Sequence, residues 1–458
     1  MLQRDLRDEL QMDRMMVTKP LSTLAADGPP RLGWRDAVAT LRSESTHARV
    51  LGGSIIMLLG SAMVSLFNFG YNVVVARMLG PAAFGHVAAV GTLLMIISAI
   101  TLSFQLVGAK VIARSETDEA KAAVYATLKR KSWLVGLLIG SGLAVTSNWI
   151  ADYLKLPSPW LVLLLSVGLA FYIPLGAKRG GLQGTCRFSA LSWNLILETV
   201  VKLVGALVFI EMGYGVYGAI AAISISEVLA YLFPGVPAEL RVPHQTGIRA
   251  SLREGLQAIV FFTGQVVINN VDILLVKHFF NDQQAGLYAA IALVGRVLYL
   301  ACWSVVSAMF PVSAGANQEE SNHTVLVVPL LIVLVISLIF IVGLGAFPDP
   351  VLRTTFGSSF QLSHTMYTLL SLRAAATGAY SLAVVLMAYE MSRKIANTGW
   401  VQLAISGAII LGIQVFHADL RQVVVVQLVL MVVLLMIVSI PFFNNKYRSG
   451  DSLWQEAA

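Results

Sequence analysis

Three basic side chains, Lys202, Arg296 and Arg373, lie within long runs of apolar residues. A charge at the centre of an apolar helix costs about 2.5–3.5 kcal/mol on membrane-insertion scales, so such residues usually have a function. Arginine stays protonated and presents a planar fork of donors to phosphate or carboxylate. These cations therefore indicate a binding site for an anionic group, such as a diphosphate or an acidic sugar. A structural ion pair, or a side chain that reaches back to the membrane surface, would explain the same charges.

Uncharged polar side chains recur at helical spacing in two of these runs. One face carries Ser61, Ser65, Asn68 and Asn72, and another carries Gln265, Asn269 and Asp272. Polar residues at membrane depth either hydrogen-bond between helices or face water. We expect the amides Asn68, Asn72, Gln265 and Asn269 to line a wet cavity, with contacts between helices as the alternative.

Acidic residues within the apolar runs have two interpretations. Asn194, Glu198 and Lys202 follow one another at intervals of four residues, so they share a helix face. Glu198 could neutralise Lys202, and we expect the pair to face the cavity. Asp272 and Glu227 are the candidates for ion or proton coupling, because a buried carboxylate can gain and lose a proton as a cavity opens.

The elements that hold these residues are predicted to be membrane-spanning helices. The chain is 57% hydrophobic and 12% charged, whereas a soluble domain has about 25% charged residues. A bilayer core of about 30 Å needs roughly 20 apolar helical residues, and the apolar runs are continuous rather than alternating. We therefore predict an all-α integral membrane protein of about twelve helices. The predicted spans lie at 51–75, 84–107, 133–150, 160–178, 188–210, 214–233, 255–276, 285–310, 325–347, 362–387, 398–416 and 419–441.

The positive charges orient the chain rather than indicating nucleic-acid binding. The formal net charge is +7, and most of the 32 Lys and Arg residues fall in alternate loops on one predicted side. The loops on the other side hold Arg77, Lys155, Lys277, Arg353 and Arg421. An excess of basic residues marks cytoplasmic loops, so both termini are predicted to be cytoplasmic.

The chain divides into two predicted lobes with cytoplasmic extensions. The N-terminal segment, 1–48, is polar, and Trp34, Val38 and Leu41 within it suit a short interfacial helix over 33–42. A disordered tail is the alternative for that segment. The further predicted parts are an N-lobe at 49–233, a cytoplasmic linker at 234–254, a C-lobe at 255–441 and a cytoplasmic tail at 442–458.

An internal repeat relates the two lobes. The segment from Asn72 to Arg77 matches that from Asp272 to Lys277, and Gly85 in the first copy matches Gly286 in the second. Both copies begin at an odd-numbered helix, so the repeat is parallel rather than inverted. Transporters are commonly built from two repeats with the substrate site between them.

These motifs resemble a known family. The run from Arg77 to Gly85 (RMLGPAAFG), the segment from Asn270, and Gly286-Leu-Tyr-Ala-Ala resemble the signatures of Wzx-type polysaccharide flippases, a family of the multidrug/oligosaccharidyl-lipid/polysaccharide (MOP) exporter superfamily. Met309-Phe310-Pro311 resembles the end of that family's eighth helix. The hinge from His278 to Asp282 departs from the usual Leu-Gly-Pro pattern. The resemblance implies two six-helix lobes around a central cavity that opens alternately to each side.

The resemblance also implies a cargo and a place in the cell. The cargo would be an oligosaccharide on undecaprenyl diphosphate, flipped from the cytoplasmic to the outer leaflet of a bacterial inner membrane for exopolysaccharide synthesis. A polysaccharide polymerase or other assembly components would be partners. A cation-coupled multidrug exporter of the same superfamily is the alternative. A membrane-embedded polymerase or ligase is a more distant one, because every predicted outer loop is short.

Other chemistry finds little support in the sequence. No GxxxxGK[ST] loop occurs, the histidines lack metal-ligand spacing, and no cofactor is expected. Cys186 and Cys302 lie in a predicted loop and a predicted helix, which disfavours a disulfide. The glycine pairs Gly136/Gly140 and Gly180/Gly184 predict close packing between helices.

Overall fold

The structure is a computed structural model that describes residues 46–241, 252–315, 323–360, 367–393 and 399–455. Every regular element within these ranges is helical. Contacts between residues divide the chain into 1–55 and 56–458, and the description below concerns the second unit. The predicted interfacial helix at 33–42 lies outside the described residues.

The first half of this unit begins within one long helix, α3 (Thr46–Ala113), which covers the first two predicted spans. Its helical geometry breaks at Gly80, whose φ of 76° suits glycine, and Pro81 follows with no N–H to donate. The remaining helices of this half are α4 (Asp118–Val145), α5 (Ser147–Tyr153), α6 (Trp160–Gly184), α7 (Phe188–Glu211) and α8 (Gly215–Leu232), and a short 3₁₀ turn, η2 (Ala238–Leu240), follows them.

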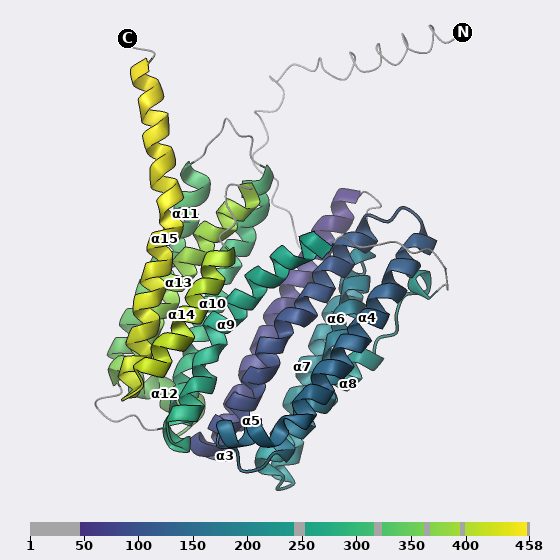
Figure 1. The fold of residues 1–458 in the computed structure, drawn as a ribbon, viewed down its shortest axis with the longest axis vertical. Helices are drawn as coiled ribbons and strands as arrows, with labels where there is room; N and C mark the ends of the chain where they lie inside the picture. The colour runs from purple at the N-terminus through teal and green to yellow at the C-terminus, as the bar shows by residue number, and fades with distance from the viewer. Residues whose placement is uncertain (1–45, 242–251, 316–322, 361–366, 394–398, 456–458) are drawn as a thin grey trace, which may run out of the picture. The chain divides into compact units, whose positions relative to one another are not determined.

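The second half repeats this order (Figure 1). Its helices are α9 (Leu252–Phe279), α10 (Asp282–Gly315), α11 (His323–Ala346), α12 (Pro348–Phe356), α13 (Tyr367–Arg393), α14 (Gly399–Val415) and α15 (Leu420–Gln455). The short helix α5 overlaps the end of the third predicted span of its half, at 133–150, and α12 directly follows the third predicted span of the other half, at 325–347. Figure 1 draws both of them toward the same end of the bundle.

The membrane-spanning character of the helices is confirmed by their length and composition. Among the described residues, nine helices are long and apolar enough to cross a bilayer, or ten if the bent pair α4–α5 is one span. That count takes the broken α3 as one span and leaves out α14, an apolar helix of 17 residues. The total of twelve remains a prediction.

Two helices extend well beyond their predicted bounds. α4 begins at Asp118, capped by the Thr117 hydroxyl, which accepts from the Ala120 N–H at 3.2 Å. The basic run from Lys129 to Lys131, which had suggested a loop, lies exposed on this helix. Lysine and arginine are good helix formers and tolerate an exposed position, so charge alone does not end the helix. α15 likewise continues to Gln455, past the predicted end at 441.

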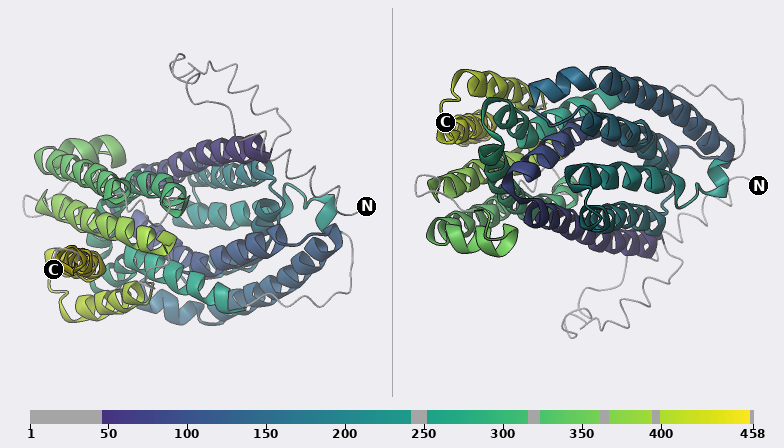
Figure 2. Two further views of the ribbon diagram at one scale, coloured as in Figure 1. Left: turned by 90° about the horizontal axis from the view of Figure 1, so that it is seen from above. Right: turned by 90° about the horizontal axis from the view of Figure 1, so that it is seen from below.

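Close packing between helices depends on the predicted glycine pairs, as expected. A Cβ on Gly136 would lie 2.7 Å from the Ala170 carbonyl oxygen, which joins α4 to α6. A Cβ on Gly184 would lie 2.8 Å from the Ile112 side chain of α3. Seen from above and from below, the blue and teal helices of the first half gather on one side (Figure 2), and among them α6 contacts α4, α7 and α8.

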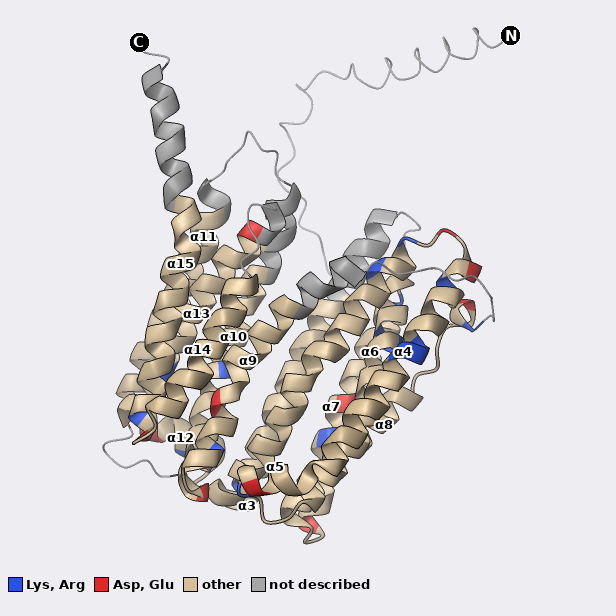
Figure 3. Cartoon of the chain, in the orientation of Figure 1, with Lys and Arg blue, Asp and Glu red and all other residues tan. Residues whose placement is uncertain are grey.

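Charged residues are sparse along the helices and gather toward their ends (Figure 3). Exposed tryptophans lie near the helix ends, such as Trp149 on α5 and Trp160 at the start of α6, which are 69% and 65% exposed. Tryptophan favours the interface between bilayer and water, so this distribution fits a chain embedded in a membrane.

Candidate functional site

A cavity of about 480 Å³ is lined by residues of both halves. Its walls come from α3, α7 and α8 of the first half and from α9 and α10 of the second. Six of the predicted site residues line it: Asn68, Asn72, Lys202, Gln265, Asn269 and Arg296. The four amides of the two polar stripes therefore line one cavity, because α3 and α9, which are equivalent in the repeat, both contribute to its wall.

Arg296 is the cation of this cavity whose donors are least satisfied. It lies on α10, and its Nε and Nη2 atoms are buried. Neither atom has a hydrogen-bond partner in the part of the chain that the structure describes. A buried charged donor without a partner is costly, and an anion that accepted its hydrogen bonds would relieve that cost.

Lys202 is the second cation of the cavity, and it is already held by the fold. Its Nζ donates to the Asn68 Oδ1 and lies 5.3 Å from the centre of the Tyr71 ring. The Tyr71 hydroxyl in turn donates to the Ala219 carbonyl oxygen at 3.0 Å. Lys202 thus brings a positive charge to the first-half wall, in a position fixed by α3 and α7.

Arg373 lies outside the cavity lining and is paired. Its Nη1 is 2.9 Å from the Asp272 Oδ2 and also donates to the Gln427 Oε1. The Tyr288 hydroxyl donates to the same Asp272 oxygen at 2.7 Å. This buried network joins α9, α10, α13 and α15. Arg373 and Asp272 therefore form an ion pair. This supports the structural interpretation of both charges over anion binding by Arg373 and ion coupling by Asp272.

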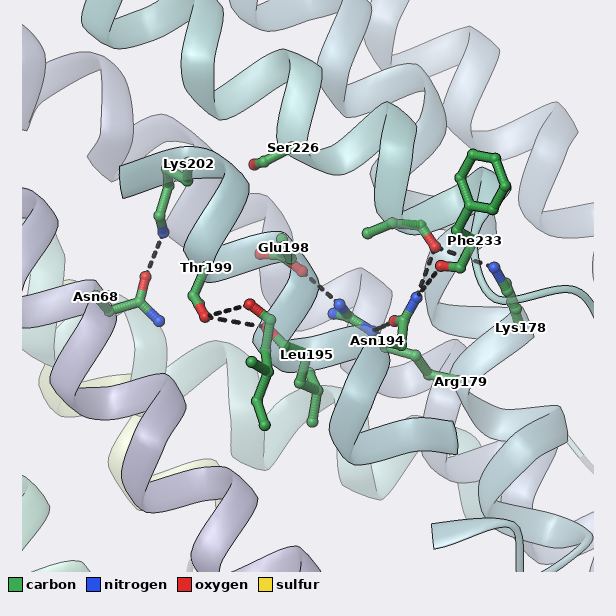
Figure 4. A network of polar contacts seen from close by, with 12 residues as sticks. Asn68, Lys178, Arg179, Asn194, Leu195, Glu198, Thr199, Lys202, Ser226 and Phe233 are labelled. Carbon is green, nitrogen blue, oxygen red and sulfur yellow. Dashed lines mark hydrogen bonds and ion pairs between the residues drawn. The ribbon is translucent and has the colours of Figure 1, made fainter. Parts of the chain in front are cut away.

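A second buried network stabilises the first half (Figure 4). Arg179 of α6 pairs with Glu198 of α7 and donates from Nε to the Asn194 Oδ1 at 2.8 Å. The Asn194 Nδ2 donates to the carbonyl oxygens of Ala230 and Phe233 at the end of α8, at 2.6 and 2.8 Å. Glu198 is thus partnered by Arg179 rather than by Lys202, and it does not line the cavity.

The predicted span at 160–178 ends at Lys178 and leaves Arg179 in the following loop, whereas both residues are buried in the last turns of α6. The Lys178 Nζ donates to the carbonyl oxygens of Ala230 and Tyr231, at 3.0 and 2.7 Å. Carbonyls at a helix C-terminus lack partners within the helix and attract cations. The sequence shows only that two basic residues stand at the end of an apolar run. Their partners on α7 and α8 are distant in the sequence, so this pattern could not identify them.

Glu227 occupies a different environment from Glu198. It is 1% exposed on α8, and neither carboxylate oxygen has a hydrogen-bond partner among the described residues. Its Oε2 lies against Gly168 of α6, where a Cβ would collide with it. Among the described residues, Glu227 thus lacks the kind of partner that Arg179 provides for Glu198.

Two aromatic residues follow Arg296 on α10. Tyr299 and Trp303 both line the cavity, with ring centres 6.0 Å apart and planes inclined by 30°. Tyr299 also stacks on Tyr380, at 5.7 Å and 25°. The Tyr299 hydroxyl accepts from the Gln265 Nε2, while the Gln265 Oε1 has no partner among the described residues. The cavity thus combines cations, amides and ring faces.

Comparisons with known proteins agree with this architecture. Residues 50–317, more than half of the chain, match the model of a family described as polysaccharide biosynthesis protein. A search of curated protein sequences finds no match.

Solved structures with the same fold include two conformations of a multidrug resistance MATE family transporter of the MOP superfamily. The inward-facing one has a TM-score of 0.67 at 16% identity and covers 88% of this chain and 99% of that one. The outward-facing one has a TM-score of 0.59 at 17% identity, with 88% and 96% covered.

A further match is the lipid II flippase MurJ in an inward closed conformation. Its TM-score is 0.67 at 13% identity, and 85% of this chain and 87% of that one are covered. Identities this low establish the fold alone. The resemblance seen in the motifs around Gly85 and Gly286 is confirmed: the chain belongs to the polysaccharide biosynthesis protein family and has the fold of the MOP superfamily of transporters.

Proposed function

We propose that this protein flips an oligosaccharide linked to undecaprenyl diphosphate from the cytoplasmic to the outer leaflet of a bacterial inner membrane. The head group would pass through the cavity between the halves by alternating access. The product would serve cell-surface polysaccharide synthesis, with a polymerase or other assembly components acting next. Both termini would lie in the cytoplasm, as the distribution of Lys and Arg predicts.

The observation that carries this proposal is that Arg296, on the cavity wall, has two buried guanidinium nitrogens with no hydrogen-bond partner among the described residues. A diphosphate offers several anionic oxygens, and a guanidinium binds two of them in a fork. Lys202 adds a second positive charge from the opposite half. A cavity with these cations favours an anionic cargo over the cationic drugs expected for a multidrug exporter.

The rest of the cavity suits the sugars of such a cargo. Amides such as Asn72 and Asn269 both donate and accept hydrogen bonds, as sugar hydroxyls do. The rings of Tyr299 and Trp303 offer apolar faces beside Arg296. The volume of about 480 Å³ lies in the range typical of small-ligand sites, so the polyprenyl tail would stay in the bilayer.

The experiment is deletion of the gene, followed by measurement of lipid-linked oligosaccharide with a probe that reaches the outer leaflet only. We expect the oligosaccharide to accumulate on the cytoplasmic side and delivery to return with the wild-type gene. Arg296→Ala should restore delivery poorly, whereas Arg421→Ala, at an exposed position in the first turn of α15, should restore it fully. Normal delivery together with altered drug tolerance would overturn the proposal and favour the exporter.

We also propose Glu227 as the group through which transport is coupled to protons. Its support is the buried carboxylate without a partner among the described residues, whereas Asp272 is held by Arg373. Flipping in vesicles should slow when the proton gradient is collapsed, and Glu227→Gln should lose that dependence. Transport that ignores both proton and sodium gradients would contradict this assignment while leaving the flippase proposal intact.

A further inference from the structure

The two copies of the repeat meet at one end of the cavity, through equivalent residues. A Cβ on Gly85 would lie 2.9 Å from the Gly286 backbone nitrogen and 3.2 Å from its Cα. Pro81, beside the break in α3, also contacts Gly286. Residues that correspond in a parallel repeat can touch each other only near the axis relating the copies. The backbones of the halves are thus in direct contact on this axis.

From the first half, Arg77 reaches across to the second. Its Nε donates to the Thr355 carbonyl oxygen at 2.8 Å, and its Nη2 donates to that of Thr354. Both carbonyls belong to the last turn of α12. A cation is favoured there because the final carbonyls of a helix lack partners within the helix and carry partial negative charge.

From the second half, Lys277 reaches across in the opposite direction. Its Nζ donates to the Lys155 carbonyl oxygen at 3.3 Å, just beyond the end of α5. The neighbouring His278 hydrogen-bonds through Nδ1 to the Tyr153 carbonyl oxygen at 2.7 Å, and the two rings stack. Arg77 and Lys277 correspond in the repeat, and so do α5 and α12. The contacts between the halves are therefore reciprocal: the basic residue of each half binds carbonyls at or just beyond the end of the other half's short helix.

These contacts join the two halves beside the cavity. Phe84, which follows the break in α3, lines the cavity and packs against Phe356 and Phe360, with ring centres 6.4 and 6.1 Å away. His86 adds a further link between the halves, with its Nε2 3.6 Å from the Asp282 Oδ2. Separation of the halves here would break both sets of hydrogen bonds together.

We propose that Arg77 and Lys277 form a reciprocal latch that holds the α5 and α12 end of the cavity closed and releases when cargo leaves. Arg77 binds two carbonyls in the last turn of α12, and Lys277 binds the Lys155 carbonyl just beyond the end of α5. The two arms differ in environment: Lys277 is fully buried and paired with Asp282 of its own half, whereas Arg77 is exposed. This role rests on transport through the cavity but not on the identity of the cargo.

The test measures the distance across this end with paired spin labels in lipid nanodiscs. The labels would be placed at Asn148→Cys on α5 and Ser358→Cys just after α12, two exposed positions in opposite halves. The background is Cys186→Ser with Cys302→Ala. We expect a mainly short distance in wild type, and a several-fold larger long-distance population in Arg77→Gln and Lys277→Gln, larger for Lys277→Gln.

Two controls use charges on the same short elements that do not cross between the halves. Arg353 pairs with Asp349 within α12, at 3.7 Å, and Lys155 contributes its backbone carbonyl rather than its side chain. Arg353→Gln and Lys155→Gln should leave the distances unchanged. An unchanged distribution in folded Arg77→Gln, with an unaltered melting temperature, would overturn the latch.

A second measurement does not depend on removing charge. A cleavable bifunctional thiol reagent that links positions 77 and 355, in the double variant Arg77→Cys with Thr355→Cys, should block transport, and cleavage of the reagent should restore it. Transport by the cross-linked form would refute the latch. Failure of the flippase proposal would appear instead as normal cargo delivery in the deletion strain, with the label distances unaffected.

Discussion

Arg296 and Arg373 are alike in sequence, but they lie in opposite environments. Both are arginines within apolar helices of the second half, on α10 and α13. Arg373 is neutralised by Asp272 and hydrogen-bonded to Gln427, away from the cavity lining. Arg296 keeps two donors without partners among the described residues, on the cavity wall. The same residue type thus stabilises the fold in one place and, under the proposed function, binds the anionic cargo in the other.

The largest effect is expected from Arg373→Met. It would leave the Asp272 carboxylate buried without its cation, and breaking a buried pair in this way costs about 3–5 kcal/mol. We expect a sharply lower melting temperature in detergent and little folded protein in the membrane. A variant as stable as wild type would mean that the pair contributes nothing to the fold.

Arg296→Met should weaken cargo binding without lowering stability, in contrast to Arg373→Met. Hydrogen bonds to charged groups contribute about 1.5–3 kcal/mol, so binding of undecaprenyl diphosphate should weaken roughly 10–100-fold. The melting temperature should stay equal or rise, because the substitution removes buried donors that have no partner among the described residues. Titration in nanodiscs and thermal denaturation measure the two quantities. Lower stability with unchanged binding would show that Arg296 is structural.

A smaller effect is expected when both members of the pair are changed. The double variant Asp272→Asn with Arg373→Met removes the unpaired charge that the single variant leaves. We expect it to recover about 1–3 kcal/mol of the stability lost in Arg373→Met, because replacing a whole buried pair is often nearly neutral. If the double variant is no more stable than Arg373→Met in the same thermal assay, the lost stability comes from packing rather than from the unpaired charge.

The smallest effect is expected from Arg296→Lys. It keeps the charge but replaces the planar fork with a single point of contact. Affinity for undecaprenyl diphosphate should fall by less than about tenfold, and the binding should weaken further with salt. Affinity as low as that of Arg296→Met would show that fork geometry, not charge, governs the site.

Much of the site could be predicted from spacing alone. Asn68 and Asn72 on α3, like Gln265 and Asn269 on α9, lie at helical intervals, and all four face the cavity. The period of a helix determines which residues share a face, so that prediction needed no partner. Which carboxylate meets which cation was not predictable in this way. Glu198 lies four residues from Lys202 but pairs with Arg179, because α6 packs against α7.

The helices themselves were determined by the sequence. Burying about 20 apolar residues in a bilayer is favourable for each segment by itself, so the spans could be located without knowing their neighbours. The parallel repeat was likewise visible in the segments from Asn72 and Asp272. Tertiary structure alone decided that Arg77 and Lys277 exchange partners and that Arg296 keeps donors without a partner among the described residues. Those outcomes depend on groups that are distant in the sequence and meet only when the helices pack, so no local pattern records them.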